Sequence, residues 1–186
     1  MKGGIIISML IKIILNRWTL LQNLMSASND LFKELMRRFA AGVTLVTFNE
    51  NGKFGGLTVS SFCSLSMNPP LVLICIDRKI ASHEALEKAT NFGVNICNSD
   101  QGKLAWDFAN SNIDKNELIN SLPHTLTGSG TPLLEGCLAS MDCKITEKYD
   151  GGDHTIFVGH VEDGNFDEKA EPLVYYGSGL GEFKPN

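Results

Sequence analysis

The chain has 186 residues, a formal net charge of -5 at pH 7, and 43% hydrophobic residues. This length fits one domain with a buried core, and the composition excludes a disordered, collagen-like or coiled-coil protein. The acidic balance, without any run of basic residues, argues against a nucleic-acid partner, because phosphate backbones are bound by clusters of lysine and arginine.

The first 25 residues differ from the rest of the chain. They contain two isoleucine-rich runs, but Lys12 and Asn16 keep the apolar stretch shorter than the ~20 residues that a membrane-spanning helix needs. A charged start, an apolar centre and small residues at 26–28 also follow the order of a secretory signal. A long polar interval and the unpaired cysteines favour a dispensable extension instead. We expect no membrane association, and we expect a chain that starts at Met25 to fold and remain active.

Five cysteines are scattered through apolar stretches: Cys63, Cys75, Cys97, Cys137 and Cys143. Their number is odd, and neither a Cys-x-x-Cys pair nor a histidine cluster accompanies them, so they predict no disulfide framework and no metal centre. We expect buried, reduced thiols in a cytoplasmic protein.

Apolar residues spaced three and four apart predict a short amphipathic helix after the N-terminal segment. It begins near Asn29, with Asn29 or Asp30 available as its cap, and ends by Gly42.

Short β-branched and apolar runs predict seven strands, over residues 43–48, 56–66, 71–76, 92–97, 137–149, 154–161 and 173–176. Asn51 and Gly52 supply the positive-φ turn of a hairpin. Two helices are expected, one capped by Ser82 and one capped by Ser99, and a long loop with at most one helical turn over 110–131. Many short strands with few helices favour a closed antiparallel barrel over a doubly wound sheet.

Small and hydroxylated residues interrupt the second predicted strand. Strand parity places Thr58 and Ser60 on one face, and Ser61 on the other unless a local bend redirects it. Hydroxyls and unpaired backbone N–H groups suit a phosphate. An edge strand whose hydroxyls meet water explains the pattern equally well, so the residues alone leave both interpretations open.

A second polar group follows the third predicted strand. Asp77, Arg78 and Lys79 end that strand, and Ser82 and His83 open the next helix. Cationic side chains and a helix N-terminus could converge there on an anion. Taken by itself, the pattern is explained more simply by a charged turn followed by a capped helix.

His154 follows a Gly-Gly turn and begins a strand, with Asp153 beside it. It is either a ligand-facing histidine or a polar strand start, and spacing favours neither. The glycine-rich run 177–181 leads into no predicted helix and lacks the Lys-Ser or Lys-Thr of a P-loop, so it predicts no nucleotide-binding motif.

Six motifs together make the chain similar to the flavin reductase-like family, over about Phe32 to Tyr176. They are, in chain order, 38–44 (RFAAGVT), 56–62 (GLTVSSF), 68–72 (NPPLV), 92–95 (FGVN), 132–136 (PLLEG) and 150–159 (DGGDHTIFVG). Each motif is modest alone, whereas six in the family's order are specific.

Members of that family reduce FMN or FAD with NADH or NADPH, and often pass the reduced flavin to a partner monooxygenase. The resemblance therefore implies a mainly β protein with short helices, an antiparallel FMN-binding split β-barrel, that forms a homodimer and acts on flavin and nicotinamide nucleotides. In this interpretation residues 1–25 are the extension and residues 26–186 are the reductase domain. A flavoprotein that binds FMN without using free nicotinamide, or one reduced by another protein, remains the alternative.

The resemblance also implies the site. The residues expected to hold the flavin are Thr58, Val59, Ser60, Ser61, Asp77, Arg78, Ser82, His83, Ser99 and Gly102. His154 matches the family histidine near the nicotinamide and the flavin ring, and it is the expected catalytic residue. The residues after Tyr176 depart from the basic and aromatic ending that is usual in the family.

Overall fold

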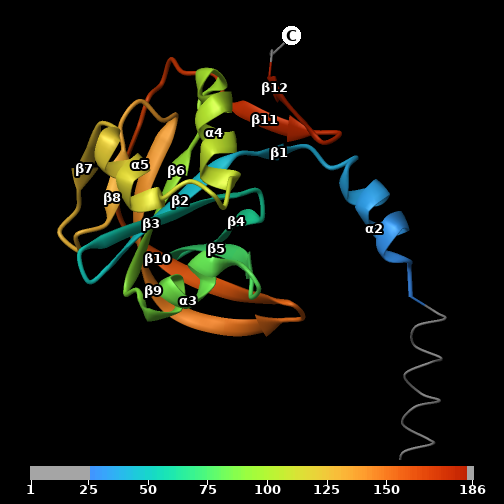
Figure 1. Cartoon of the computed structure of the whole chain (residues 1–186), viewed down its shortest axis with the longest axis horizontal. Coiled ribbons are helices and arrows are strands. Elements are labelled where there is room, and N and C mark those ends of the chain that lie inside the picture. The colour runs from blue at the N-terminus through green and yellow to red at the C-terminus, as the bar shows by residue number, and fades with distance from the viewer. Residues whose placement is uncertain (1–25, 184–186) are drawn as a thin grey trace, which may run out of the picture. The chain divides into compact units, whose positions relative to one another are not determined.

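The computed structural model of the protein describes residues 26–183 (Figure 1). The predicted extension, residues 1–25, lies outside the described residues. The chain divides into two units, Met1–Phe39 and Ala40–Asn186. Within the described range, no helix has an apolar stretch long enough to cross a bilayer.

The described part of the first unit is helix α2 (Asn29–Met36), which the sequence predicts. The predicted caps are wrong, because Asn29 and Asp30 already lie inside the helix. Ser28 is the cap: its backbone is extended, and its Oγ accepts a hydrogen bond from Leu31 N over 3.2 Å. No residue of α2 is buried.

Seven antiparallel strands form the main sheet of the second unit. They are β2 (Thr44–Glu50), β3 (Lys53–Val59), β4 (Phe62–Met67), β5 (Pro70–Asp77), β6 (Asn91–Ile96), β9 (Ala139–Gly151) and β10 (His154–Phe166). Their order in the sheet is β3-β2-β6-β9-β10-β5-β4. The predicted antiparallel, mainly β architecture is therefore confirmed, and Asn51 and Gly52 have the positive φ angles predicted for the β2–β3 turn.

The sheet rolls into a barrel that stays open along one seam. The strands at its two edges, β3 and β4, follow each other in the chain with only Ser60 and Ser61 between them, so the edges must approach each other. No ladder joins β3 to β4, so the expected full closure is wrong. The single strand predicted over 56–66 is also wrong, because Ser61 leaves the β3 ladder and instead hydrogen-bonds Cys75 on β5.

Two smaller sheets complete the β structure. One contains β1 (Ala41–Gly42), β11 (Leu173–Tyr176) and β12 (Gly179–Glu182), and the other contains β7 (His124–Leu126) and β8 (Pro132–Leu134). Of these five strands, only β11 is predicted from the sequence.

Four helical elements cover the barrel: α3 (Ala81–Lys88), the 3-10 helix η1 (Ser99–Gln101), α4 (Gly102–Ala109) and α5 (Lys115–Ser121). Both predicted caps are wrong. Ser82 is the second residue of α3, and the N-cap position belongs to Ile80. Asn98 caps the turn at Ser99: its Oδ1 accepts from Asp100 N over 2.9 Å, and its own N–H donates to Gln101 Oε1 over 2.9 Å.

Strand β2 is buried on both faces and separates the core into two groups. Val46 and Phe48 belong to the group inside the rolled sheet, whereas Leu45 packs with Ala105 and Phe108 of α4. Since α4 and α5 cover the outer face, every residue of the run 43–48 is buried, including Thr44 and Thr47, and burial does not alternate.

The five cysteines are all free thiols. Burial raises the pKa of Cys97 and of Cys143 to about 12. The expectation of buried thiols is wrong for Cys63, which is exposed on edge strand β4, and for Cys75, which is half-buried.

Candidate functional site

The outer edge of β3 is the first feature of the candidate site. One edge of this strand pairs with no other strand of the described sheet. Phe54 directs its main-chain N–H to this edge, where it donates to Asn116 Oδ1 over 2.9 Å. Alternate residues of an antiparallel strand direct both main-chain groups the same way. Gly56 and Thr58 therefore present main-chain donors and acceptors at this edge.

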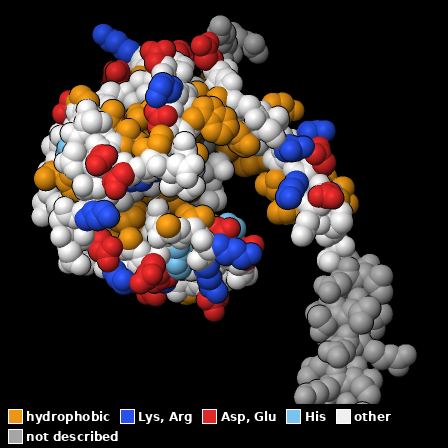
Figure 2. All heavy atoms as spheres, viewed as in Figure 1, with side chains coloured by type: hydrophobic (Ala, Val, Ile, Leu, Met, Phe, Trp, Pro, Cys, Tyr) orange, Lys and Arg blue, Asp and Glu red, His pale blue; other side chains and the backbone are white. Residues whose placement is uncertain are grey.

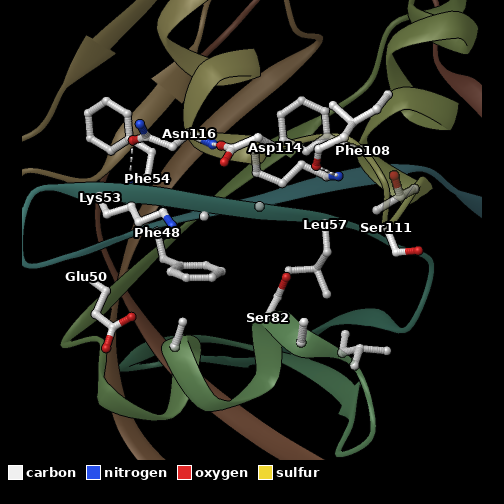
Figure 3. A pocket seen from close by; sticks show the side chains of 18 of the residues that line it. Phe48, Glu50, Lys53, Phe54, Leu57, Ser82, Phe108, Ser111, Asp114 and Asn116 are labelled. Atoms are coloured by element: carbon white, nitrogen blue, oxygen red, sulfur yellow. Dashed lines mark hydrogen bonds between the residues drawn. The ribbon is translucent and has the colours of Figure 1, made fainter.

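A cavity of about 470 Å³, which we call the β3 cavity, lies along this edge between β3, α3 and the α4–α5 segment. In Figure 3, Phe48 and Leu57 lie between β3 and α3, and Ser82 points toward them from α3. Asp114 and Asn116 lie on the other side of β3. The volume is in the range of about 300–1,000 Å³ that small-molecule pockets occupy.

Two glycines let aromatic rings lie directly on the β3 backbone. A Cβ added to Gly56 would lie 2.6 Å from Cε1 of Phe108, and one added to Gly55 would overlap the ring of Phe48. In both cases the added Cβ would lie closer to the ring than Cβ atoms normally approach other atoms. Gly55 and Gly56 lie in the middle of β3 and form no turn. Their missing side chains let the two rings pack on the strand and leave its edge accessible.

Four charged side chains line the β3 cavity: Glu50, Lys53, Asp114 and Lys115. Lys115 Nζ donates to two main-chain carbonyl oxygens, at 2.6 and 2.9 Å. Burial lowers the pKa of Lys115, and Asp114 opposes this effect. The N–H of Glu117 at the start of α5 holds the pKa of Asp114 below its usual value. The cavity thus combines apolar walls with ammonium groups that can meet an anion.

A second cavity of about 210 Å³, which we call the α4 cavity, adjoins the first. The two share Thr58 and Ala109 in their linings. The remaining walls of the α4 cavity come from α4, from Ser60 and from the β11–β12 hairpin.

The hydroxyl residues predicted to bind flavin reach different places. Thr58 lines both cavities, with its Oγ1 donating to Ala105 O over 2.6 Å, and Ser60 lines the α4 cavity. Ser61 Oγ donates to Cys75 O over 2.7 Å. The side chain of Val59 is buried in the core. Ser82 lines the β3 cavity.

Ser99 and Gly102 lie where η1 meets α4, and neither lines these two cavities. Ser99 N donates to Glu171 O over 2.8 Å. A Cβ added to Gly102 would lie 3.7 Å from Leu180, a residue of the α4 cavity, so Gly102 stands behind that wall.

The other predicted residues, Asp77, Arg78, His83 and His154, lie near Thr155, which the sequence did not predict as a site residue. We call these five residues the Thr155 cluster. None of them lines the β3 or the α4 cavity. The hydroxyl of Thr155 accepts from Arg78 Nε over 3.2 Å and lies 2.8 Å from His83 Nε2. Arg78 also pairs with Asp150. Most of the polar groups that could bind an anion here are already hydrogen-bonded within the protein.

His154 begins β10 opposite Asp77 of β5. Its Nδ1 lies 2.7 Å from Asp153 Oδ1, and this hydrogen bond lowers the pKa of Asp153. The imidazole is 38% exposed, and its Nε2 has no hydrogen-bond partner among the described residues.

Sequence reasoning missed several residues of the two cavities: Phe48, Lys53, Trp106, Phe108, Asp114, Lys115 and Asn116. Some lie on or beside α5, in the segment predicted as a loop. Asp114 followed three residues later by Glu117 and then an apolar pair is the pattern of a capped helix start, and it would have predicted α5.

Comparison with known proteins gives consistent matches. A family model described as flavin reductase like domain matches residues 36–184. The actinorhodin polyketide dimerase of Streptomyces coelicolor is 36% identical over 155 residues, which cover 81% of this chain and 84% of that protein. The reductase component of a 4-nitrophenol 4-monooxygenase/4-nitrocatechol 2-monooxygenase of Rhodococcus opacus is 36% identical over 154 residues, 83% of this chain and 80% of that one.

A solved structure matches the fold as well. The NADH:FAD oxidoreductase of Streptomyces globisporus, in complex with NAD and FAD fragments, superposes with a TM-score of 0.79 at 32% identity. The match covers 86% of this chain and 94% of that chain. The rolled sheet and its short helices are therefore shared over most of both molecules.

Proposed function

The chain belongs to the flavin reductase like domain family, and we infer that it is an enzyme that transfers hydride from NADH or NADPH to FMN or FAD. The observation that carries this inference is the β3 cavity, where apolar walls, hydroxyls and unpaired main-chain groups meet at one strand edge.

The donor set of this cavity fits a flavin. Phe48, Leu57 and Phe108 offer apolar surface to a flat ring. The main-chain groups of Gly56 and Thr58 suit the alternating donors and acceptors of the ring edge. The Ser82 hydroxyl and Lys53 suit a phosphate, whereas Lys115 already donates to two carbonyl oxygens.

The bound flavin supplies the redox chemistry, accepting hydride from the nicotinamide. The protein's part is to hold the two ligands together and to keep water out of the contact between them. We assign His154 to the positioning of the nicotinamide, because Asp153 engages its Nδ1 and leaves Nε2 for the ligand.

A steady-state assay of NADH and NADPH oxidation with added FMN, FAD and riboflavin tests the proposal. We expect flavin-dependent oxidation of at least one nicotinamide. A protein that binds flavin but oxidises neither nicotinamide would be the non-catalytic flavoprotein instead, and a protein that is reduced only by another protein would be an electron carrier.

The same proposal includes a homodimer, a cytoplasmic location and, as its downstream partner, a flavin-dependent monooxygenase. Edge strand β4 supports self-association, since Leu65 and Met67 expose apolar surface there, and the five free thiols fit a reducing compartment. We also propose that residues 1–25 are dispensable. Sedimentation velocity of the full chain tests for the homodimer. The same measurement on a chain that starts at Met25 tests whether residues 1–25 are dispensable for folding and assembly.

A further inference from the structure

The α4 cavity has walls unlike those of the β3 cavity. Trp106 and Ala109 come from α4, Tyr175 and Leu180 from the β11–β12 hairpin, and Ser60 from the link between β3 and β4. Figure 2 shows hydrophobic side chains gathered on the surface between α4 and strands β1 and β11. No charged residue lines the α4 cavity.

Helix α4 contributes two alanines and the indole of Trp106 to the wall of the α4 cavity. Ala105 and Ala109 are one helical turn apart and both line the cavity, so this face of α4 carries only methyl groups. Trp106 follows Ala105 and is 56% exposed, although its neighbours Ala105 and Phe108 are buried. An indole held at the mouth of an apolar cavity offers a face on which another ring can stack.

The size of the α4 cavity limits what can enter. At about 210 Å³ it is smaller than the ~300 Å³ at which whole-ligand pockets begin, so it suits one part of a larger ligand. Because it shares Thr58 and Ala109 with the β3 cavity, a ligand part bound here lies next to whatever occupies the larger cavity.

Polar groups at the cavity are few. The hydroxyl of Thr58 already donates to Ala105 O, whereas the exposed hydroxyl of Ser60 has no hydrogen-bond partner among the described residues. A planar group with one or two polar substituents, such as an amide or an amine, therefore fits better than a phosphate or a sugar.

We propose that the α4 cavity is a stacking subsite for a flat aromatic ring of a nucleotide ligand, adenine or nicotinamide, with Trp106 as the stacking partner and Ser60 bonding a ring substituent. This subsite deepens the proposed function and rests on it for the identity of the ligands. Trp106 then determines nucleotide affinity, while hydride transfer takes place at the β3 cavity.

Steady-state kinetics of Trp106→Ala, Trp106→Phe and the control Tyr149→Ala test the proposal. Tyr149 is 54% exposed on β9 and lines neither cavity, so its loss removes a comparable exposed ring elsewhere. We expect Trp106→Ala to raise one KM by about tenfold with kcat within twofold, Trp106→Phe to restore most of the affinity, and Tyr149→Ala to change neither.

The choice of substrate identifies the ring. A higher KM for FAD but not for FMN assigns the adenine of FAD. A higher KM for NADH but not for reduced nicotinamide mononucleotide assigns the adenine of NADH, and a higher KM for both assigns the nicotinamide. Unchanged KM values for all four ligands overturn the proposal, as does a change in oligomeric state alone, which would place Trp106 in a protein interface.

A binding measurement separates this proposal from the proposed function. The chain has two tryptophans, so in a Trp18→Phe background the indole fluorescence reports Trp106 alone. We expect saturable quenching by AMP or nicotinamide mononucleotide that Ser60→Ala weakens, even if the protein oxidises no NADH. Normal NADH oxidation without quenching by either nucleotide would instead remove the subsite and leave the reductase function intact.

Discussion

The β3 cavity and the Thr155 cluster both contain hydroxyl, cationic and acidic side chains beside strands of the main sheet. They differ in what their polar groups are already bonded to. At the β3 edge, Gly56 and Thr58 present main-chain groups that no neighbouring strand pairs. In the cluster, Arg78 and His83 both hydrogen-bond the hydroxyl of Thr155.

This difference decides which region can bind a ligand at low cost. A group that already has a good partner gains little when it exchanges that partner for a ligand, because the net value of one hydrogen bond is only about 1 kcal/mol. A main-chain group at the unpaired edge gives up no protein partner, so it gains that net value when it bonds a ligand. We therefore propose that Arg78 and His83 mainly stabilise the fold, with His154 as the member of the cluster that a ligand can reach.

The largest expected effect is a loss of flavin affinity on substitution of Gly56 at the β3 edge. Gly56→Val places a branched side chain against the Phe108 ring, 2.6 Å from the new Cβ, and covers the strand edge. Overpacking should cost about 1–3 kcal/mol of folding stability. Displacement of the Phe108 ring and the loss of edge contacts should lower flavin affinity by about a hundredfold, or about 3 kcal/mol. Fluorescence titration with FMN and FAD measures this.

Gly128→Val is the matched control, since a Cβ at Gly128 meets nothing within 4 Å. It should leave flavin affinity within about twofold. If Gly56→Val binds flavin as well as the control does, the flavin does not use the β3 edge.

The next effect concerns the accessible histidine of the Thr155 cluster. His154→Ala should lower the rate of hydride transfer by about ten- to a hundredfold, a positioning loss of a few kcal/mol, and leave flavin affinity within severalfold. Stopped-flow reduction by NADH and NADPH gives the rate. His160→Ala, on the same strand, serves as control. A wild-type rate in His154→Ala would make His154 a strand-start residue without a part in the reaction.

A smaller effect tests the structural role of the cluster. Thr155 is 5% exposed, and Thr155→Val removes the partner of both Arg78 Nε and His83 Nε2. We expect the free energy of unfolding to fall by about 1–3 kcal/mol, measured by urea denaturation, with flavin affinity within about threefold. Thr125→Val, at an exposed threonine, should change stability by less than about 0.5 kcal/mol. A loss of flavin affinity without loss of stability would place a ligand at the cluster.

Apolar and β-branched runs bounded by turn residues predicted most of the main sheet, including β5, β6 and β10. The bend at Ser60 and Ser61 was not predicted, since a strand interrupted by hydroxyls looks continuous until Ser61 bonds Cys75 on a neighbouring strand. Full closure failed for the same reason, because ladder formation between strand edges depends on contacts distant in sequence.

The candidate site was only partly predictable. Thr58 and Ser60 stood out as hydroxyls in an apolar strand and Ser82 as a helix cap, but the family resemblance assigned them to the site, and the structure places all three at cavities. Phe48 and Trp106 look like ordinary core or surface residues, and only the packing of α4 and β3 brings them to cavity walls. Burial cannot be read from residue type alone: the indole of Trp106 is 56% exposed although its neighbours Ala105 and Phe108 are buried.

The smallest expected effect is on the melting temperature, and it concerns the exposed Asp153–His154 pair beside the Thr155 cluster. The hydrogen bond from His154 lowers the pKa of Asp153. A carboxyl whose pKa is lower in the folded protein than in the unfolded chain stabilises the fold above its unfolded pKa of about 4, and this contribution is lost as the pH falls through the lowered folded value. Asp153→Asn should therefore slightly lower the melting temperature at pH 7 and should not lower it at a pH below the folded pKa. The effect is small because water screens an exposed pair. Glu168→Gln, another exposed carboxyl, is the control; an equal effect of both variants across this pH range would show that the Asp153–His154 pair adds no stability of its own.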